Sequence, residues 1–208
     1  MTLAIAAYRT KVLALLDDPL LARYTANQVD AAIRSALETY SLFKPNVGTY
    51  YVDSNGEARF LLPASFEASA IVNIEWVHTD PVYSNLIPFY AYLQDSQWTV
   101  ETKNMTIPIG QQLMIEYNTT HYIDGLDSAV GTSVPTADEN LLTVGAAAYA
   151  VSSRATSKTE SNNLNPREAE TLARHAVEWL TIFMKRLGMP DTGIASVSWA
   201  DKSIDKAY

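Results

Sequence analysis

The hydrophobic period of this sequence changes twice along the chain, and no other feature limits the possible folds as strongly. In residues 1–45 and 134–188 apolar side chains recur every three or four positions, the spacing of amphipathic helices. Residues 46–133 instead carry short runs rich in β-branched and aromatic residues, separated by turn-forming residues. We therefore predict an α+β fold: a four-helix core, a β-strand insertion between the second and third helices, and an extended C-terminal tail over residues 189–208.

Two helices are expected before the insertion. The first has an apolar stripe over residues 3–16 and ends before a proline. The second begins after Thr25, because Thr25 and Gln28 have the spacing of a capping box, in which each side chain accepts a hydrogen bond from an unpaired backbone N–H. It is expected to end at Lys44-Pro45.

Two longer helices are expected after the insertion. The third starts at another capping-box spacing, Thr136–Glu139, and continues to about Lys158. Its side chains are small and apolar almost all round, which is typical of a central, buried helix. The fourth has Asn165 as its cap and Pro166 at its first position, and continues to Leu187.

The insertion is expected to open with a β-hairpin. Residues 49–53 and 57–62 read as strands and flank Asn55-Gly56, the dipeptide preferred in two-residue hairpin turns. The further strands expected are Ala70–Val77, Trp98–Thr102, Met105–Pro108 and Leu113–Asn118. The stretch Thr79–Ser96 is rich in aromatic residues but has no clear period, and is expected to be a loop.

Negative charge is concentrated in the insertion. The 208 residues include 15 Lys and Arg against 23 Asp and Glu, a formal net charge of −8, and residues 45–140 hold 12 of the acids against only Arg59 and Lys103. Binding to nucleic-acid phosphates needs clustered cations, so the charge argues against that function. The chain has no cysteine, which excludes disulfides and thiolate chemistry. Without a membrane-length apolar stretch or a signal-peptide pattern, we expect an intracellular protein that does not contact membranes.

Few residues are candidates for chemistry. His78, His121 and His175 are the only histidines, and His121 with Asp124 and Asp127 is the only cluster that resembles a metal site. Neither a second nearby histidine nor a glycine-rich nucleotide or nucleophile motif accompanies it. We therefore expect no enzyme activity, no metal and no cofactor, and interpret His121 as the polar end of a strand.

The C-terminal tail, residues 189–208, is the candidate partner-binding segment. It is polar and carries five isolated apolar side chains that are the expected contacts: Ile194, Val197, Trp199, Ile204 and Tyr208. A large aromatic side chain such as that of Trp199 is suited to fill a pocket on a partner. The alternative, in which the tail folds back on its own helical core, is equally compatible with the sequence.

Taken in order, several segments resemble the head–tail connector (adaptor) proteins of tailed bacteriophages. Residues 29–41 resemble the second helix of that family, and Val134–Glu139 resembles the start of its Ala-rich third helix. Arg59-Phe-Leu-Leu-Pro63 resembles the aromatic-x-Leu-Pro end of one of its strands, and Trp98–Val100 resembles a short strand of its insertion. Leu113–His121 resembles its Tyr-x-x-x-His strand. The resemblance covers about Thr25–Leu187 and rests on order and spacing together. The stretch Thr79–Ser96 departs from it, being longer and more aromatic.

The resemblance implies a structural protein at the head–tail neck of a virion, assembled in the host cytoplasm. Such proteins form a ring, usually of twelve copies, beneath the portal protein, extend the DNA channel, and present a surface to the next neck or tail protein (stopper or tail completion). The genome passes through without specific binding. The helices would pack between subunits, the C-terminal segment would reach the portal or a neighbouring subunit, and no residue would be catalytic.

Three alternatives remain open from the sequence. The chain is compatible with a tail-completion or stopper ring protein of the neck, one ring further down. It is also compatible with a glycan- or receptor-binding virion module that uses the aromatic stretch Tyr83–Tyr92. The third is a metal-dependent hydrolase built around His121, Asp124 and Asp127.

Overall fold

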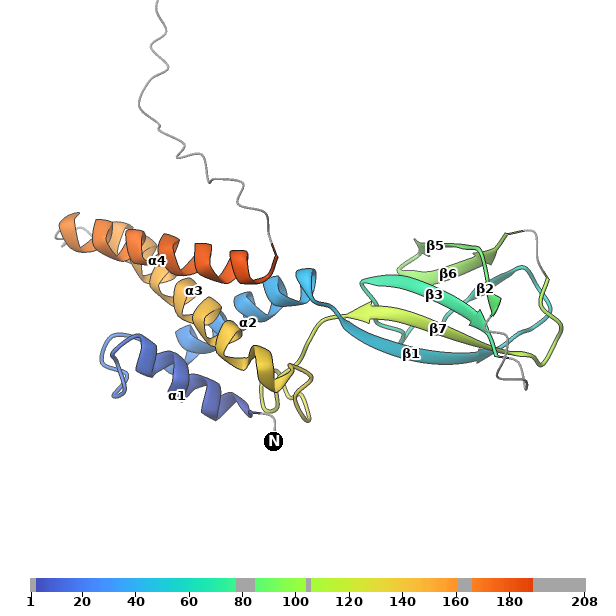
Figure 1. Cartoon of the computed structure of the whole chain (residues 1–208), viewed down its shortest axis with the longest axis horizontal. Helices are drawn as coiled ribbons and strands as arrows, with labels where there is room; N and C mark the ends of the chain where they lie inside the picture. The colour runs from blue at the N-terminus through green and yellow to red at the C-terminus, as the bar shows by residue number, and fades with distance from the viewer. Residues whose placement is uncertain (1–2, 78–84, 104–105, 161–165, 189–208) are drawn as a thin grey trace, which may run out of the picture.

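The capping box at Thr25 begins the helix that links the two halves of the molecule. The N–H of Gln28 donates to Thr25 Oγ1 (3.3 Å), and the N–H of Thr25 donates to Gln28 Oε1 (2.8 Å), as expected from the spacing. The computed structural model describes residues 3–77, 85–103, 106–160 and 166–188. These form a helical lobe and a β lobe, which are joined at the end of this helix (Figure 1). The fold class is therefore α+β, as predicted.

The helical lobe is built around its third helix. Its elements are α1 (Ile5–Leu15), α2 (Ala26–Phe43), the 3₁₀ turn η1 (Thr136–Asp138), α3 (Glu139–Glu160) and α4 (Pro166–Arg186). α3 packs against α1, α2 and α4, and its alanines are buried. Gly145 lets α4 approach closely, because a Cβ there would lie 2.7 Å from the ring of Phe183, which is itself fully buried. The sequence thus predicted correctly that this helix is central.

The start of α3 differs from expectation. No side-chain cap forms at its entry through η1. The Glu139 side chain is instead buried, and accepts hydrogen bonds from the backbone N–H of Leu3 (3.3 Å) and from Lys11 Nζ (3.4 Å). The capping-box prediction was wrong here because a tertiary partner competes for the carboxylate: α1 begins without a side-chain cap, and Glu139 accepts a donor at that end.

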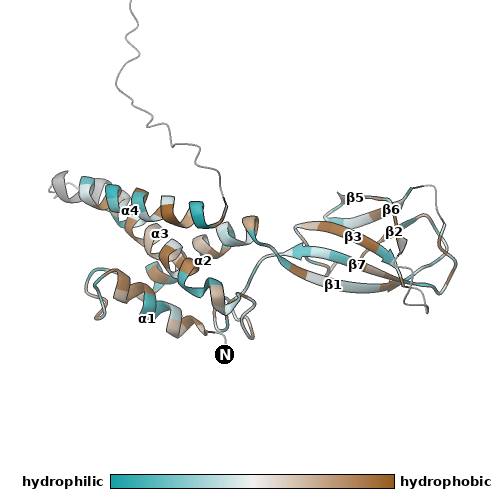
Figure 2. Cartoon of the chain, in the orientation of Figure 1, coloured by the Kyte–Doolittle hydropathy of each residue, from teal (hydrophilic) through white to brown (hydrophobic). Residues whose placement is uncertain are grey.

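The β lobe contains two antiparallel sheets with a core of their own. Its strands are β1 (Asn46–Asp53), β2 (Arg59–Leu61), β3 (Ala70–Trp76), β4 (Asn85–Leu86), β5 (Phe89–Gln94), β6 (Gln97–Thr102) and β7 (Gln112–Thr119). One sheet has the order β1-β7-β3-β4 and the other β2-β6-β5. Buried aliphatic side chains between them, such as Ile74, Val100 and Ile115, form a cluster separate from that of the helices. Hydrophobic residues occur in both lobes (Figure 2).

The prediction of a hairpin at the start of the insertion is wrong. β1 pairs with β7 and β2 pairs with β6, so the Asn55-Gly56 dipeptide carries the chain from one sheet to the other. Ser54 explains the difference: its N–H donates to Gln111 O (2.8 Å), and its hydroxyl donates to Ile107 O (2.9 Å). These non-local bonds close the end of β1 against the chain before β7, where a hairpin would need bonds to β2.

Two further segments of the insertion differ from the prediction. Residues 106–108, expected within a strand, have no strand partner, although the Ile107 side chain is fully buried in the β core. The stretch Thr79–Ser96, expected to be a loop, contains β4 and β5 in its described part. β5 and β6 form a hairpin whose turn residues, Asp95 and Ser96, both have positive φ (51° and 65°). Residues 78–84 lie outside the described ranges.

The two lobes are joined by two chain segments that lie beside each other. The first runs from the end of α2 into β1 and the second leaves β7, and Asn46 pairs with Thr119 at the point where they meet. After β7 the chain returns to the helical lobe at once. Ile123 and Leu126, which lie within the range expected for the insertion, pack in the helical cluster.

Candidate functional site

The tail residues expected to bind a partner, Ile194, Val197, Trp199, Ile204 and Tyr208, lie outside the described residues. Among the described residues, the candidate sites are the His121 cluster, the junction between the lobes, the outer faces of the two sheets and the cavities.

The side chains of His121, Asp124 and Asp127 do not converge. Both ring nitrogens of His121 have other partners, as described below, and Asp124 accepts a hydrogen bond from the N–H of Gly131 (3.1 Å). Asp127 is bound by the guanidinium of Arg34, at 2.6–2.9 Å. Within residues 3–77, 85–103, 106–160 and 166–188, no group of three or more His, Asp or Glu side chains is placed to hold a metal ion. The structure therefore gives the hydrolase alternative no site.

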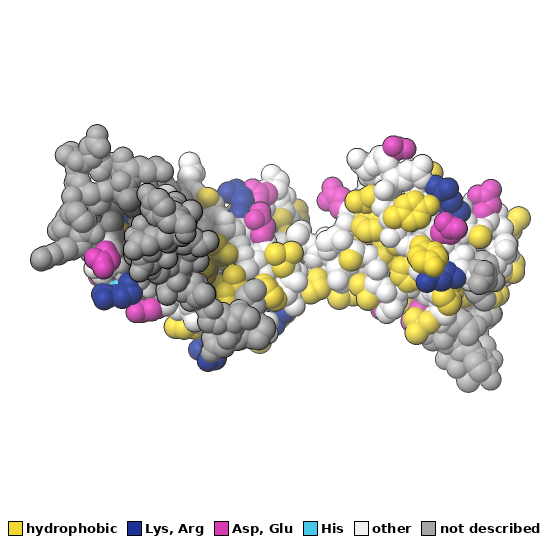
Figure 3. Space-filling model, turned by 90° about the horizontal axis from the view of Figure 1, so that it is seen from above, with side chains coloured by type: hydrophobic (Ala, Val, Ile, Leu, Met, Phe, Trp, Pro, Cys, Tyr) yellow, Lys and Arg dark blue, Asp and Glu magenta, His cyan; other side chains and the backbone are white. Residues whose placement is uncertain are grey.

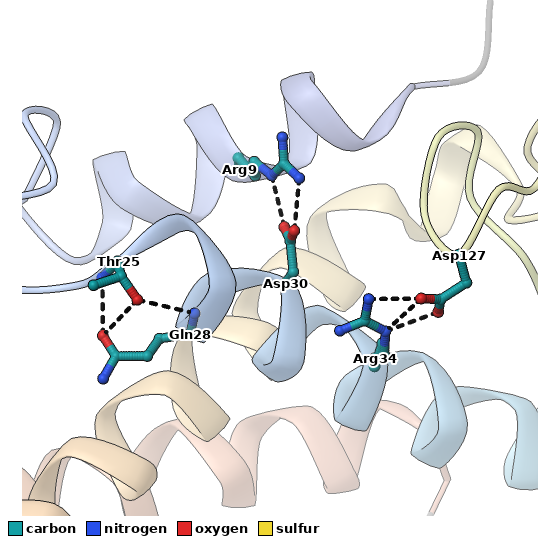
Figure 4. Close-up of polar contacts among 6 residues, drawn as sticks. All are labelled: Arg9, Thr25, Gln28, Asp30, Arg34 and Asp127. Carbon is teal, nitrogen blue, oxygen red and sulfur yellow. Dashed lines mark hydrogen bonds and ion pairs between the residues drawn. The ribbon is translucent and has the colours of Figure 1, made fainter.

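Asp127 forms one of two ion pairs that connect elements of the helical lobe. Arg34 of α2 binds Asp127 in the loop after β7, and Arg9 of α1 binds Asp30 of α2 through two bonds of 2.6 Å (Figure 4). Two parallel N–H···O bonds make a guanidinium–carboxylate pair directional. These carboxylates thus set the positions of α1 and the loop relative to α2, which is a structural role.

His121 lies at the junction between the lobes. Its backbone N–H donates to Ser41 Oγ (2.9 Å), its Nε2 is 3.0 Å from the carbonyl oxygen of Lys44, and its Nδ1 is 3.0 Å from Ser133 Oγ. A carbonyl oxygen only accepts, so Nε2 carries the proton and Nδ1 accepts from the serine hydroxyl. One imidazole therefore ties the chain leaving β7 to the C-terminal end of α2, from which β1 begins.

Burial favours the neutral form of His121, and hydrogen bonds favour an ionised Asp138. Burial lowers the pKa of His121 below its ordinary value. The hydroxyl of Tyr40 donates to Asp138 Oδ2 (2.7 Å) and Lys44 Nζ donates to the same oxygen (2.9 Å); these bonds, that of Tyr40 foremost, lower the pKa of Asp138. The Tyr40 ring also meets the His121 ring edge-on, 5.0 Å between centroids. The junction is a closed polar network that holds the lobes together and offers no open site.

The outer face of the three-stranded sheet is aromatic and carries charges of both signs, because exposed Glu101 lies in register between Arg59 and Tyr90. Leu61 of β2 lies opposite Thr99 of β6, and Tyr92 of β5 lies on the other side of Thr99. Tyr90 is 59% exposed and Leu61 is 56% exposed. Lys103 Nζ lies 3.8 Å from the centroid of the Tyr90 ring, and the Arg59 guanidinium lies 5.8 Å from that of Tyr92. Figure 3 views the molecule from this side, with hydrophobic, cationic and acidic side chains mixed on the β lobe.

The outer face of the four-stranded sheet is acidic and apolar. The register places Tyr51, Met114, Glu75 and Leu86 in one row across all four strands. Glu116 lies in the next row, where Asn73 Nδ2 donates to its Oε2 (2.9 Å). The same register directs Ile74 and Ile115 to the core, so the named acids point away from it.

One cavity of the helical lobe mixes apolar and cationic walls. It has a volume of about 270 Å³ and lies between the α1–α2 connection, α3 and α4, with Leu15, Tyr24, Arg154, His175 and Trp179 among its lining residues. Arg154 donates to the carbonyl of Arg23 and stands 5.1 Å from the Tyr24 ring. His175 is exposed on α4.

Comparisons with known proteins give few matches. No family model and no curated protein matches the chain. Two similar solved structures are a chain of the virion of a native gene transfer agent particle (11% identity, 85% of this chain and 88% of that chain covered, TM-score 0.31) and a chain of the neck of an empty gene transfer agent particle (12%, 85%, 88%, TM-score 0.30). Superpositions at these TM-scores carry no functional argument.

Sequence reasoning missed both the junction and the two sheet faces. His121 was interpreted as a strand end, and its partners Ser41, Lys44 and Ser133 are far from it in sequence. The outer face of the three-stranded sheet was missed because β5 lies in the stretch that was expected to be a loop. The available signal was the alternation of exposed Tyr90 and Tyr92 with half-buried Phe89 and Ala91, the period of a strand with one covered face.

In the part of the chain that the structure describes, no helix is long and apolar enough to cross a membrane.

Proposed function

We propose that this chain is a structural protein of the neck of a tailed-phage-like virion, a head–tail adaptor that forms a ring, of twelve copies, beneath the portal protein. In this role the ring extends the DNA channel and presents a surface to the next neck or tail protein. It acts without catalysis or cofactor, and the genome passes it without specific binding.

The observation that carries the proposal is where the resembling segments lie. Residues 29–41 contain the buried face of α2. Arg59–Pro63 and Trp98–Val100 pair in the three-stranded sheet, and Leu113–His121 runs from β7 into the junction. The segments that resemble connector proteins thus build the framework of both lobes and the link between them. Exposed apolar side chains on both lobes supply the surface that an assembly protein needs.

The tail is the proposed attachment segment. Gly188, with a φ of 88°, ends the last helix, and the twenty residues 189–208 follow. We propose that Trp199 and its apolar neighbours Ile194, Val197, Ile204 and Tyr208 bind the portal or an adjacent subunit. The entropy cost of ordering such a segment on binding is offset only when apolar side chains enter pockets on the partner.

Reconstitution with the portal protein encoded by the same genome tests the proposal. We expect the free chain to be monomeric or weakly associated by light scattering, and electron microscopy to show a ring of it on the portal after mixing. A chain lacking residues 189–208 is expected to keep its helical and β circular dichroism and to lose attachment. Failure of the full chain to bind the portal at any concentration rules out the adaptor role, and unchanged docking of the truncated chain rules out the tail as the anchor.

The same experiment distinguishes the adaptor from the alternative role, a stopper or tail-completion protein that forms a ring one level further down the neck. In that case the chain fails to bind the portal alone but binds a portal that already carries its adaptor ring.

A further inference from the structure

One edge of the four-stranded sheet is long and open. β1 lies at this edge and pairs with β7 on one side, and no strand of the described residues pairs with its other side. About half of the residues of β1 direct their N–H and C=O groups to this open edge. A row of unpaired backbone groups is a template for a further strand.

β1 lacks the features that usually prevent such pairing. Bulges, prolines and charged side chains, lysine above all, protect natural sheet edges. Asn46–Asp53 contains no bulge, proline, lysine or arginine, and its one charged residue is the last. By contrast, β2 has only three residues and carries Arg59, and β4 has only two residues, with Pro88 close behind. The other open edge is β5, with six residues.

The core behind β1 is incompletely covered. Its inward-facing Tyr50 and Val52 are half-buried, whereas their partners on β7, Ile115 and Leu113, are buried. All four belong to or pack against one cluster, so the difference comes from the open edge of β1. A further strand there would bury the exposed parts of Tyr50 and Val52 if it carried apolar side chains at alternate positions.

The tail contains a segment with this pattern. In residues 194–199, Ile-Ala-Ser-Val-Ser-Trp, the last five alternate strictly between apolar and polar, the period of a strand with one covered face. One face of such a strand carries Ala195, Val197 and Trp199. Residues 192–200 include no charged side chain. At about 3.3 Å per residue the segment spans roughly 20 Å, against roughly 26 Å for β1.

The tail leaves the helical lobe at the end that faces the β lobe (Figure 1). α3 and α4 are consecutive helices, and Gly145 lies against Phe183, so the last turn of α4 lies beside the start of α3. Asp138, directly before α3, accepts a hydrogen bond from Lys44 at the end of α2 (2.9 Å). β1 begins two residues later, at Asn46. The tail and β1 therefore both start at the junction.

We propose that residues 194–199 add to the open edge of β1 in the same chain, as a strand parallel to β1 with Ala195, Val197 and Trp199 facing the core. The linker, residues 189–193, extends over at most about 18 Å. An antiparallel strand would have to begin at the far end of β1, roughly 26 Å from the junction, which the linker does not reach. β1 is selected over β5 because it is longer and begins at the junction.

This inference goes beyond the proposed function, because it concerns the free chain. While Trp199 and its neighbours cover the edge, they cannot enter a pocket of the portal, so attachment requires the segment to leave β1. Parallel pairing is slightly less stable per residue than antiparallel pairing, which suits a contact that opens. Until then, the covered edge cannot pair with the edge of another copy.

Disulfide trapping tests the contact, since the chain has no cysteine of its own. The pairs Thr49→Cys/Ser196→Cys and Thr49→Cys/Ser198→Cys place thiols on the outward faces of β1 and of the added strand. We expect at least one pair to form an intrachain disulfide at least about tenfold faster than the control Tyr92→Cys/Ser196→Cys, which places the first thiol on β5. Trapping at Thr49 no faster than at Tyr92 overturns the proposal. Links that form only between chains, seen by non-reducing electrophoresis, overturn it in favour of a second copy.

Hydrogen exchange of the free chain gives a second measurement without cysteines. Val197→Pro removes an N–H and an apolar side chain from the segment, and Ser203→Pro is the matched control outside it. We expect the open-edge N–H groups of β1 to exchange at least about tenfold faster in Val197→Pro and at the wild-type rate in Ser203→Pro. The N–H groups that bond β1 to β7 check that the β lobe stays folded. Equal exchange in the wild type and Val197→Pro overturns the contact.

These outcomes are independent of the adaptor function, because both measurements use the chain without portal. If intrachain trapping succeeds and the full chain fails to bind the portal, the contact with β1 stands and the adaptor function is wrong. If the full chain binds the portal and neither trapping nor exchange detects the segment on β1, the contact is wrong and the adaptor function stands.

Discussion

At the scale of single residues, His121 ties the chain that leaves the β lobe to the helical lobe. Its ring and its backbone contact Ser41 and Lys44 at the C-terminal end of α2 and Ser133 in the segment before α3. The ring is buried and neutral, so protonation places a charge in an environment that disfavours it. The stability of the junction is therefore expected to depend on pH.

Acidification is expected to weaken the fold through His121. Well above its ordinary pKa of 6.5 the imidazole is neutral in both the folded and unfolded chain, and its titration has no effect on stability. Below that value the unfolded chain takes up a proton that the folded chain resists, so the free energy of unfolding falls as the pH drops from about 7.5 to about 5.5. Urea unfolding at both ends of this range measures the change.

Substitution identifies the residue responsible. His121→Gln is expected to lower the free energy of unfolding by about 1–3 kcal/mol at neutral pH, since it perturbs buried hydrogen bonds, and to reduce the pH dependence in this range. His175→Gln, on the exposed face of α4, is the matched control and is expected to keep both the stability and the pH dependence. An unchanged pH dependence in the His121 variant would show that another group is responsible.

Among the elements, the contact between α3 and α4 depends on a single missing side chain. Gly145 lies under the Phe183 ring, and a Cβ at this position would lie 2.7–2.9 Å from three ring atoms. The ring is fully buried and has no room to turn away. The close approach of α3 and α4 at this point therefore requires a glycine at position 145.

Gly145→Ala is expected to destabilise the protein although alanine favours helix. The helix preference of alanine contributes about 1 kcal/mol, while overpacking of a rigid core costs about 1–3 kcal/mol. In a Phe183→Leu background the smaller side chain relieves the clash, and the same substitution is expected to be neutral or stabilising. Chemical unfolding of the four proteins gives the coupling energy, and a coupling near zero would contradict the packing described here.

The sequence predicts the elements whose signals are local. The Thr25–Gln28 capping box and the apolar α3 were found because neighbours within one helix decide them. The hairpin at Asn55-Gly56 failed because Ser54 bonds to residues more than fifty positions away, and the Glu139 cap failed because Leu3 and Lys11 compete for its carboxylate. Sheet pairing and the site faces that follow from it depend on such distant partners.

The β5–β6 turn gives a test of the strand that the sequence did not reveal. Asp95 and Ser96 both have positive φ, a conformation that costs a non-glycine residue about 1 kcal/mol. Ser96→Gly is therefore expected to raise the free energy of unfolding by about 0.5–1 kcal/mol, as a glycine suits this turn. Ser96→Ala is the control and is expected to give no such gain. A loss of stability on Ser96→Gly would mean that this turn is not present.

At the scale of the whole molecule, the two lobes have separate hydrophobic clusters and meet at one narrow junction (Figure 1). The chain enters the β lobe at Asn46 and leaves it at Thr119, and these residues are paired neighbours in the sheet. Paired strands have Cα atoms about 5 Å apart, so the ends of the β segment are no further apart than the ends of a tight turn. This arrangement suits an insertion into a helical protein, and we propose that each lobe folds as a unit.

Separation of the lobes tests this proposal. A chain in which about four Gly/Ser residues replace residues 46–119 is expected to keep cooperative helical unfolding, because the linker spans the gap between the paired ends and His121 keeps its partners. Residues 46–119 expressed alone are expected to unfold cooperatively, followed by the fluorescence of Trp76 and Trp98; Trp179 reports the helical lobe. The control replaces residues 46–101, which leaves β7 without its partner strands β1 and β3, and is expected to aggregate. Loss of cooperative unfolding in the first chain would mean that the helices need the β lobe to fold.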